Sequence, residues 1–297
     1  MEILNEIKAS FKKGSYLTQL IYINLAVFVL INLVQVFWFL IAQNNSASPA
    51  IYWLSLPADL SQFIWKPWTI VTYMFLHEGF MHVLFNMLWL YWFGQIFLQY
   101  LDQKQLLSVY LLGGISGGLF YIIAYNLFPV FAADMPFSFA LGASASVMAI
   151  VFAISFYVPN YEVHLFFIGK VKLKFIAIFS IFLDLLSIPN GNAGGHIAHI
   201  GGALFGLWFI SEYKKGHLIT KKFDRILNSF FTLFKKQPKM KVSYKKTGNV
   251  DYDYQNKKQK RNQNIDVILE KISKSGYSSL TKEEKEFLFK MSDKNKS

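Results

Sequence analysis

The sequence predicts an all-α membrane protein built as a bundle of six transmembrane helices. Of its 297 residues, 54% are hydrophobic and 18% aromatic, and the mean hydropathy is +0.31 in spite of a long lysine-rich tail. This composition is typical of a polytopic membrane protein with a polar extension rather than of a soluble domain. The chain contains no cysteine, which excludes disulfides, thiolate nucleophiles and thiolate–metal sites.

Six apolar segments have about the length that a transmembrane helix needs, which is roughly 20 residues. They cover residues 17–42, 79–101, 105–128, 142–158, 173–189 and 195–211. The first segment is too long for the core of a signal peptide, so we interpret it as a retained signal anchor. The loop that follows contains FIWKPWTIVTYMF, whose aromatic side chains suit a membrane interface. We therefore expect a membrane-associated first loop.

The whole net charge of +12 lies in the C-terminal tail, because residues 1–211 contain equal numbers of basic and acidic side chains. A basic tail directly after a membrane helix indicates contact with anionic lipid headgroups of the bilayer, and we expect no nucleic-acid partner. Lysines of residues 1–211 also gather in the loops of one side. We therefore expect a multi-pass cell-membrane protein with cytoplasmic N- and C-termini and a site that opens to the outer face.

The chain is expected to divide into five parts. A short segment, residues 1–15, precedes the core, residues 16–212. Residues 213–236 carry apolar side chains at steps of three or four between lysines, which predicts an amphipathic juxtamembrane helix, with a coiled-coil partner site as the alternative. Residues 237–264 are predicted to be a disordered basic linker. Residues 265–297 are predicted to form a short helical motif, with a capping box between Thr281 and Glu284.

The polar side chains of the predicted core gather in one layer near one end of the bundle. His82 and Asn86 fall in the first two turns of the second helix, Ser144 in the first turn of the fourth, and His199 about one turn into the sixth. Ionisable groups at such a depth are functional candidates, because burying them in lipid is unfavourable by several kcal/mol. A serine and a histidine in one layer suggest a nucleophile and its general base.

The spacing of the other residues supports this chemistry. His82 and Asn86 are four residues apart and project from one helix face, so both can donate hydrogen bonds to one oxyanion, with the backbone N–H of Ser144 as a third donor. Gly202 and Gly206 form a small-xxx-small face that allows a close helix crossing. If the neighbour is the fourth helix, Ser144 and His199 come within hydrogen-bond distance.

Three motifs together resemble those of the rhomboid intramembrane serine proteases. They are the H-x-x-x-N of His82 and Asn86 in HEGFMHVLFN, the G-x-S of Gly142 and Ser144, and AHIGGALFG with His199, Gly202 and Gly206. The resemblance covers residues 16–212 and implies a rhomboid-like six-helix bundle without a cofactor. It also implies that a Ser144–His199 dyad cleaves transmembrane protein substrates, with His82, Asn86 and the Ser144 N–H holding the oxyanion.

The sequence departs from the family pattern at two positions next to the serine. Ala145 stands where many members have glycine, and Met148 stands where many have a tyrosine that stacks on the histidine. A thioether can pack against an imidazole, so we expect an altered rate or specificity rather than loss of activity. In the first loop, WKPW is similar to the Trp-Arg element of the family, with Lys66 where arginine is common.

Three further residues are candidates for supporting roles. We expect Asp184 to cap backbone amides of the loop SIPNGNAGG, with orientation of His199 in a Ser-His-Asp triad as the alternative. His77 and His196 lie at the boundary of the bundle. Interfacial or loop hydrogen bonding is the default role for both, and contact with substrate is the alternative.

Three rival functions follow from the same residues. A zinc protease is disfavoured, since HEGFMH has one residue too many for H-E-x-x-H and places His77 and His82 about 140° apart on a helix. The second rival is a non-proteolytic rhomboid-like protein that binds transmembrane helices. The third is a proton-coupled transporter that uses the histidines and Asp184, but no inverted repeat supports it. Neither the substrate nor the oligomeric state has a signature in the sequence.

Overall fold

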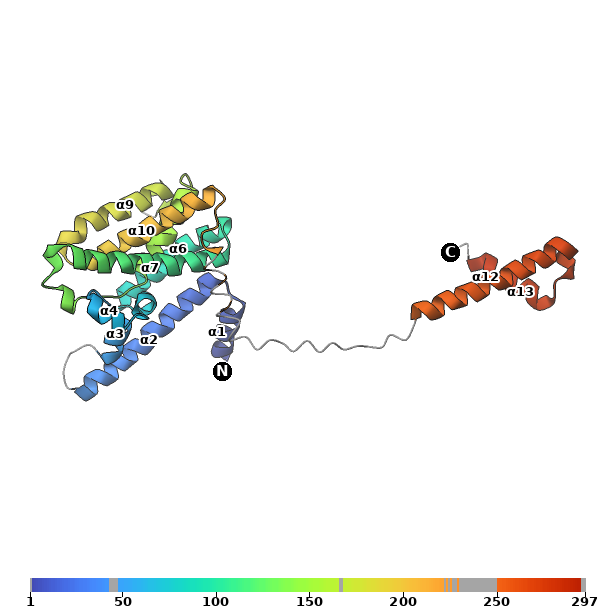
Figure 1. Ribbon diagram of the computed structural model, residues 1–297, viewed down its shortest axis with the longest axis horizontal. Helices are drawn as coiled ribbons and strands as arrows, with labels where there is room; N and C mark the ends of the chain where they lie inside the picture. Colours follow the sequence, from blue (N-terminus) through green and yellow to red (C-terminus); the bar gives the residue numbers. More distant parts are fainter. Residues whose placement is uncertain are drawn as a thin grey trace. The chain divides into compact units, whose positions relative to one another are not determined.

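The computed structural model describes residues 2–42, 48–165, 168–221, 223, 225, 229 and 250–294 (Figure 1). The chain separates into two compact units, Met1–Lys236 and Gln237–Ser297. The first unit contains the short helix α1 (Glu2–Lys13) and the membrane bundle. In the described ranges, five helices are long and apolar enough to span a bilayer: α2 (Tyr16–Ala42), α6 (Phe80–Tyr100), α7 (Gln103–Leu127), α9 (Leu173–Ser187, extended by the 3-10 turn η4, Ile188–Asn190) and α10 (Ala193–Lys214).

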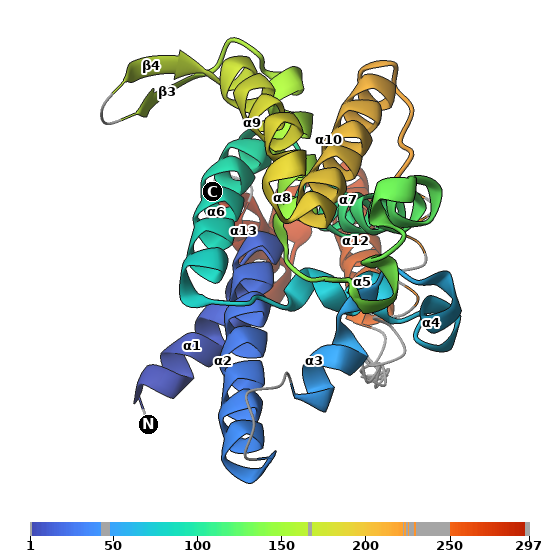
Figure 2. The same ribbon diagram turned by 90° about the vertical axis from the view of Figure 1, so that its left-hand side faces the viewer.

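The sixth apolar helix is α8 (Ser144–Tyr157), which has only 14 residues. At about 1.5 Å per residue it is shorter than the roughly 30 Å hydrocarbon core of a bilayer. It contacts α6, α7, α9 and α10, and Figure 2 shows it between these helices. Nearly all of its side chains are buried. Because protein rather than lipid surrounds it, α8 does not need to cross the membrane. The predicted six-helix bundle is confirmed, with helix ends within a few residues of those expected.

The crossing of α8 and α10 is as close as the glycine spacing predicts. A Cβ atom at Gly202 would overlap the carbonyl oxygen of Ala145, and one at Gly206 would overlap that of Ala149. Gly117 of α7 leaves room for the Cβ atom of Ala145 on α8 and for the carbonyl oxygen of Ala198 on α10. The backbone of α10 therefore touches those of α7 and α8, and these three helices form the centre of the bundle.

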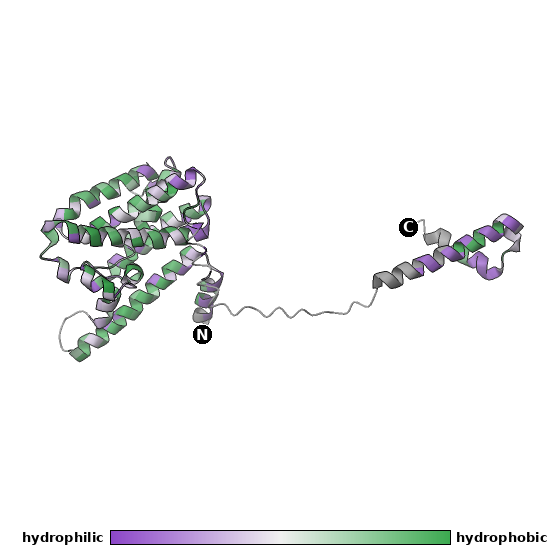
Figure 3. Cartoon of the chain, viewed as in Figure 1, coloured by the Kyte–Doolittle hydropathy of each residue, from purple (hydrophilic) through white to green (hydrophobic). Residues whose placement is uncertain are grey.

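Hydrophobic residues occur along the whole length of the bundle's helices (Figure 3), and many of their side chains are exposed. Exposed side chains on α2 and α9 include Leu30, Phe37, Leu40, Phe179, Phe182 and Leu186. Exposed apolar surface of this extent is unfavourable in water and is the expected surface of a helix bundle in lipid.

The first loop is a folded element of the bundle. It contains α3 (Pro49–Leu54), β1 (Leu56–Pro57), α4 (Leu60–Trp65), α5 (Thr69–Thr72) and the 3-10 turn η1 (Tyr73–Phe75). Two further 3-10 turns, η2 (Pro129–Phe131) and η3 (Met135–Phe137), precede β2 (Phe139–Ala140). The strands β1 and β2 pair antiparallel, which connects the loop to the chain that enters α8. The exposed indoles of Trp65 and Trp68 suit the bilayer interface predicted for this loop.

A β-hairpin connects α8 to α9. Its strands β3 (Glu162–Leu165) and β4 (Gly169–Lys172) pair antiparallel, with Glu162 opposite Lys172. The end of α10 differs from the expected core boundary at residue 212. The helix continues to Lys214, whose Nζ donates to the Phe156 carbonyl at 2.7 Å, and Ile219 packs against the core. The core therefore extends beyond residue 212.

The second unit contains α12 (Val250–Ser275), the 3-10 turn η5 (Tyr277–Ser279) and α13 (Lys282–Lys294). The predicted capping box is present: the N–H of Thr281 donates to Glu284 at 2.8 Å, and the N–H of Glu284 donates to Thr281 Oγ1 at 3.3 Å. The expectation of disorder is wrong for residues 250–264, which are helical and rich in lysine and glutamine, both good helix formers. Residues 237–249 and half of the expected juxtamembrane helix 213–236 lie outside the described residues. In the described half, α10 ends at Lys214, and residues 215–220 are not helical, contrary to the expectation.

Candidate active site

A cavity of about 1240 Å³ lies between α6, α8, α9 and α10, where α8 begins. Its lining includes His82 and Asn86 from α6, Ser144 from α8, Asp184 from α9 and His199 from α10. The fold thus brings together five candidate residues from four helices. Gly142 and Met148 also line this cavity, and Met148 lies one turn after Ser144 on α8.

Ser144 is the first residue of α8, so its backbone N–H has no acceptor within the helix. Gly142, two residues before the start of α8, has a left-handed φ of +134°. Its N–H donates a hydrogen bond to the carbonyl of Tyr73 at 2.9 Å. A Cβ atom at Gly142 would stand 3.0 Å from His82 Nε2 and 3.5 Å from Ser144 Oγ. The imidazole of His82 and the hydroxyl of Ser144 therefore approach the same point, which only glycine leaves open.

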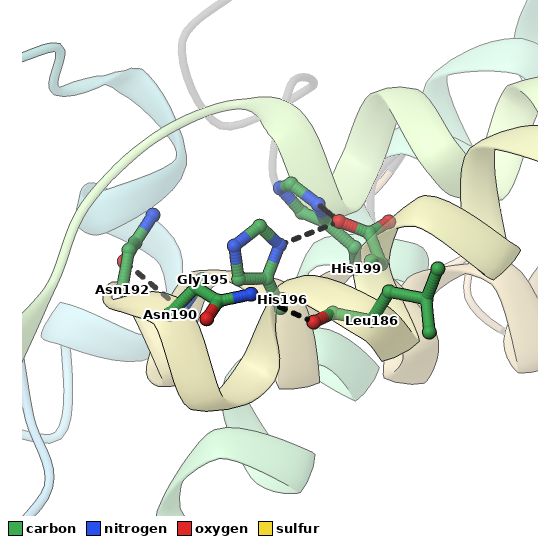
Figure 4. A network of polar contacts seen from close by, with 7 residues as sticks. Leu186, Asn190, Asn192, Gly195, His196 and His199 are labelled. Atoms are coloured by element: carbon green, nitrogen blue, oxygen red, sulfur yellow. Dashed lines mark hydrogen bonds and ion pairs between the residues drawn. The ribbon is translucent and has the colours of Figure 1, made fainter.

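Asp184 binds two imidazoles through one carboxylate oxygen. Its Oδ1 lies 2.8 Å from Nδ1 of His199 and 2.7 Å from Nδ1 of His196. Figure 4 labels both histidines, which lie on α10, and marks these contacts with dashed lines. An ionised carboxylate only accepts hydrogen bonds, so each Nδ1 carries the proton, and Nε2 of His199 is left as an acceptor.

The expected role of Asp184 as a cap for the loop before the last helix is wrong. The cap is Asn192, which has a left-handed φ of 48° and accepts a hydrogen bond from the N–H of Gly195 at 3.2 Å (Figure 4). The carboxylate lies instead beside the imidazoles, because the rotation of α9 about its axis turns Asp184 toward α10.

No hydrogen bond joins Ser144 to His199 among the described residues, although both side chains border the cavity. Such bonds are often long in a site without substrate and shorten when substrate binds. Asn86 donates one amide hydrogen to the carbonyl of His82 at 2.8 Å, which leaves its second amide hydrogen for another acceptor.

The two other candidate histidines do not line the cavity. His196 stands beside it as the second partner of Asp184. His77 is buried, its ring lies 5.1 Å from that of His82, and neither ring nitrogen has a hydrogen-bond partner in the described part of the chain. Burial and the nearby His82 lower the pKa of His77 to about 4. The imidazole of His77 is therefore neutral near pH 7.

Sequence reasoning missed the apolar walls of the cavity. They are formed by Phe85 and Trp89 of α6 and by Phe175 and Phe179 of α9. The two residues of each pair are four positions apart on an apolar helix, and this spacing is the sequence signal for the cavity walls. Side chains that face lipid have the same spacing, so the signal does not distinguish a cavity wall from a lipid-facing surface. The sequence also gave no sign that Lys66 is buried, with its Nζ 3.5 Å from the centre of the Tyr52 ring.

Comparison with known proteins identifies relatives of this chain. A family described as "Rhomboid domain" matches residues 65–213, and a family of unknown function (DUF6576) matches residues 248–294. The chain is 31% identical over 157 residues to "RHOMBOID-like protein 12, mitochondrial" of Arabidopsis thaliana, and the match covers 50% of this chain and 47% of the relative. It is 28% identical over 196 residues to "Presenilin-associated rhomboid-like protein A, mitochondrial" of Danio rerio, and this match covers 63% of this chain and 46% of the relative. The chain thus spans about half the length of the curated relatives it matches.

The relatives contradict the expected location in a cell membrane with cytoplasmic termini. These relatives are named as mitochondrial proteins. A further relative is "Rhomboid-like protein 17, chloroplastic" of Arabidopsis thaliana. It is 26% identical over 149 residues, and the match covers 47% of this chain and 46% of the relative. The error has a physical reason. The lysine distribution predicts how a bundle is oriented in its membrane, but it carries no information on which membrane that is.

The DUF6576 match coincides with α12 and α13, so the second unit has relatives of its own. The "Rhomboid domain" match covers half of the chain and includes α6 to α9 and nearly all of α10, which supply the α-helical residues of the cavity. The chain therefore belongs to the rhomboid family.

Proposed function

We propose that this chain is an intramembrane serine endopeptidase that cleaves transmembrane segments of proteins in an organellar membrane. The observation that carries the proposal is that Ser144, His199, His82 and Asn86 border one cavity, inside a bundle with exposed apolar side chains on its outer surface. Rhomboid family proteins act in membranes on transmembrane segments, which supports the substrate class. The mitochondrial and chloroplastic names of the relatives support the location.

In the proposed reaction, Ser144 Oγ attacks the scissile carbonyl carbon while Nε2 of His199 takes the hydroxyl proton. The tetrahedral intermediate collapses, the C–N bond breaks, and His199 returns the proton to the leaving amine. Water then hydrolyses the acyl-enzyme with His199 again as the base. Asp184 is a positioning residue here: it holds the Nδ1–H of His199, which keeps Nε2 unprotonated at the start and stabilises the imidazolium that forms.

Three donors surround the place where the oxyanion would form. They are Nε2–H of His82, the free amide hydrogen of Asn86 and the backbone N–H of Ser144. Fixed donors of this kind stabilise the charge that develops on the carbonyl oxygen and need no reorganisation during the reaction. The approach of His82 and Ser144 to Gly142 supports this assignment.

A transmembrane substrate needs a path from lipid to the serine. Phe85 of α6 and Phe179 of α9 both line the cavity, and their side chains are 59% and 60% exposed at the outer surface. Helices α6 and α9 each pack on α8. We propose that the substrate helix enters between α6 and α9, where these aromatic side chains offer an apolar surface.

The test is labelling by a serine-reactive fluorophosphonate, together with cleavage of a model transmembrane substrate in proteoliposomes. Wild type should be labelled and active, whereas Ser144→Ala and His199→Ala should lose turnover and still insert and accumulate. Ser146→Ala is the matched control, because Ser146 lies two residues on, buried and away from the cavity lining. Near-normal turnover of Ser144→Ala would rule out the serine mechanism.

The second candidate function is a non-proteolytic rhomboid protein that binds transmembrane helices. The observation that favours it is the separation of Ser144 from His199, which no hydrogen bond joins in the part of the chain that the structure describes. A folded wild-type protein that crosslinks to a transmembrane peptide from α6 and α9, yet shows neither labelling nor cleavage, would support this function instead.

A further inference from the structure

The carboxylate and the two imidazoles that meet at the cavity wall have the composition of a metal site. Asp184, His196 and His199 each offer one ligand atom, and these three atoms lie within 4.8 Å of one another. Elsewhere in the described ranges, no other group of three or more His, Asp or Glu side chains is so arranged. Two imidazole nitrogens and one carboxylate oxygen are a common ligand set for Zn²⁺, which keeps a fourth position for water.

The cluster can hold a zinc ion after its three ligand atoms, which now lie within 4.8 Å of one another, move to equal separations. Tetrahedral Zn²⁺ with bonds of about 2.0–2.1 Å holds its ligand atoms roughly 3.3 Å apart. The oxygen of Asp184 now lies 2.7 and 2.8 Å from the two Nδ1 atoms, so these separations must grow by about half an ångström. Asp184 and His199 line the cavity, so water from the cavity can reach the fourth position.

We infer that Asp184, His196 and His199 form an inhibitory binding site for Zn²⁺ or a similar divalent transition metal. The inhibition rests on the proposed protease function, whereas the binding does not. A neutral imidazole that binds a metal through Nδ1 carries its proton on Nε2. Binding therefore moves the proton of His199 from Nδ1 to Nε2 through water, with no net proton released by either imidazole.

The consequence concerns Nε2 of His199, the nitrogen that takes the proton of Ser144 in the proposed reaction. With the metal bound, His199 presents an N–H instead of a lone pair at Nε2, so it cannot accept the proton of Ser144. The carboxylate of Asp184, which otherwise favours the active tautomer, is a metal ligand in this state. One cluster would thus hold His199 in an active form without metal and in an inactive form with it.

Replacement of His196 separates metal binding by the cluster from its proposed role in proteolysis. It is a ligand but does not line the cavity, and it contacts neither Ser144 nor His82 through any hydrogen bond in the described residues. The variant His196→Ala should therefore retain turnover after chelation, and the zinc concentration that halves turnover should rise at least about tenfold. Loss of even an outer-sphere partner weakens metal sites by about 10–100-fold. The control is His217→Ala, which removes an exposed histidine bound to Glu212 at the far end of α10.

Direct binding is measured by titrating Co²⁺, a spectroscopic substitute for Zn²⁺, into the full-length Ser144→Ala protein in detergent. Because this variant lacks the nucleophile, the visible absorption bands of bound Co²⁺ report on the site whether or not the chain is a protease. We expect saturable tetrahedral bands at one equivalent, displaced by Zn²⁺ and absent from Ser144→Ala/His196→Ala. His196→Gln provides a second variant if His196→Ala does not fold.

The outcomes are distinct. Zinc inhibition that EDTA reverses, that His196→Ala weakens and that His217→Ala leaves unchanged supports the inference. Equal zinc sensitivity of His196→Ala and wild type, or Co²⁺ bands that persist without His196, overturns it. A protein that binds Co²⁺ through His196 but cleaves no substrate would retain the metal site and overturn the protease function alone.

Discussion

Nδ1 of His199 lies 2.8 Å from Oδ1 of Asp184, a contact between two helices that adjoin in the chain and cross beside the cavity. The contact determines which nitrogen of His199 carries a proton, because a carboxylate accepts but does not donate. The rhomboid resemblance implies a serine–histidine dyad. In the proposed mechanism, this contact would let Asp184 orient the imidazole of His199 as the aspartate of a triad does.

Replacement of Asp184 by asparagine should lower kcat by about 10²–10⁴, because the amide can donate to Nδ1 and favour the wrong tautomer of His199. Substrate cleavage at saturating substrate measures the effect, with His196→Ala as the matched variant that removes the other partner of the same oxygen. Asp184→Glu should recover part of the rate. An Asp184→Asn protein with wild-type kcat and only a lower melting temperature would show that the contact is structural.

His82→Ala and Asn86→Ala should reduce kcat more than they weaken substrate binding, since both side chains are proposed to act on the oxyanion. Removal of one such donor typically lowers kcat by about 10²–10³. Steady-state kinetics with a transmembrane substrate separates kcat from KM for each variant. A rise in KM at constant kcat for both variants would place them in a substrate groove instead.

Gly202→Ala should destabilise the bundle, because the added Cβ would overlap the carbonyl oxygen of Ala145. Overpacking of this kind is unfavourable by about 1–3 kcal/mol, measurable as a lower melting temperature in detergent. Gly79→Ala is the control: this glycine precedes α6 with a φ of −149°, and a Cβ there would meet no atom within 4 Å. Similar stability of the two variants would contradict the close crossing of α8 and α10.

The stability of the protein should fall below neutral pH through His77. Because burial lowers the pKa of His77 from 6.5 to about 4, the unfolded chain binds a proton that the folded protein does not. The contribution is complete above about pH 6.5 and is lost as the pH falls toward 4, by up to about 3 kcal/mol.

Melting temperatures at several pH values between 4 and 7.5 test this expectation. His77→Gln should flatten the pH dependence, whereas His164→Gln, which replaces an exposed histidine on β3, should leave it unchanged. An unchanged slope in His77→Gln would mean that other groups cause the loss of stability.

The membrane helices could be predicted from the sequence alone, because a helix in lipid satisfies its backbone within its own segment and needs only a long apolar run. The positions of His82, Asn86, Ser144 and His199 along these helices placed them in one layer. The spacing of Gly202 and Gly206 predicted a close helix crossing, since only small residues permit contact between backbones, and the structure identifies the neighbour as α8.

The tertiary structure alone decided which partners the polar groups have. The rotation of α9 about its axis turns Asp184 to His196 and His199, and this rotation depends on packing against α8 and α10 rather than on any local pattern. In the same way, α8 is a short buried helix because four neighbours surround it. Hydropathy records how much apolar surface a segment has, but not whether lipid or protein covers it.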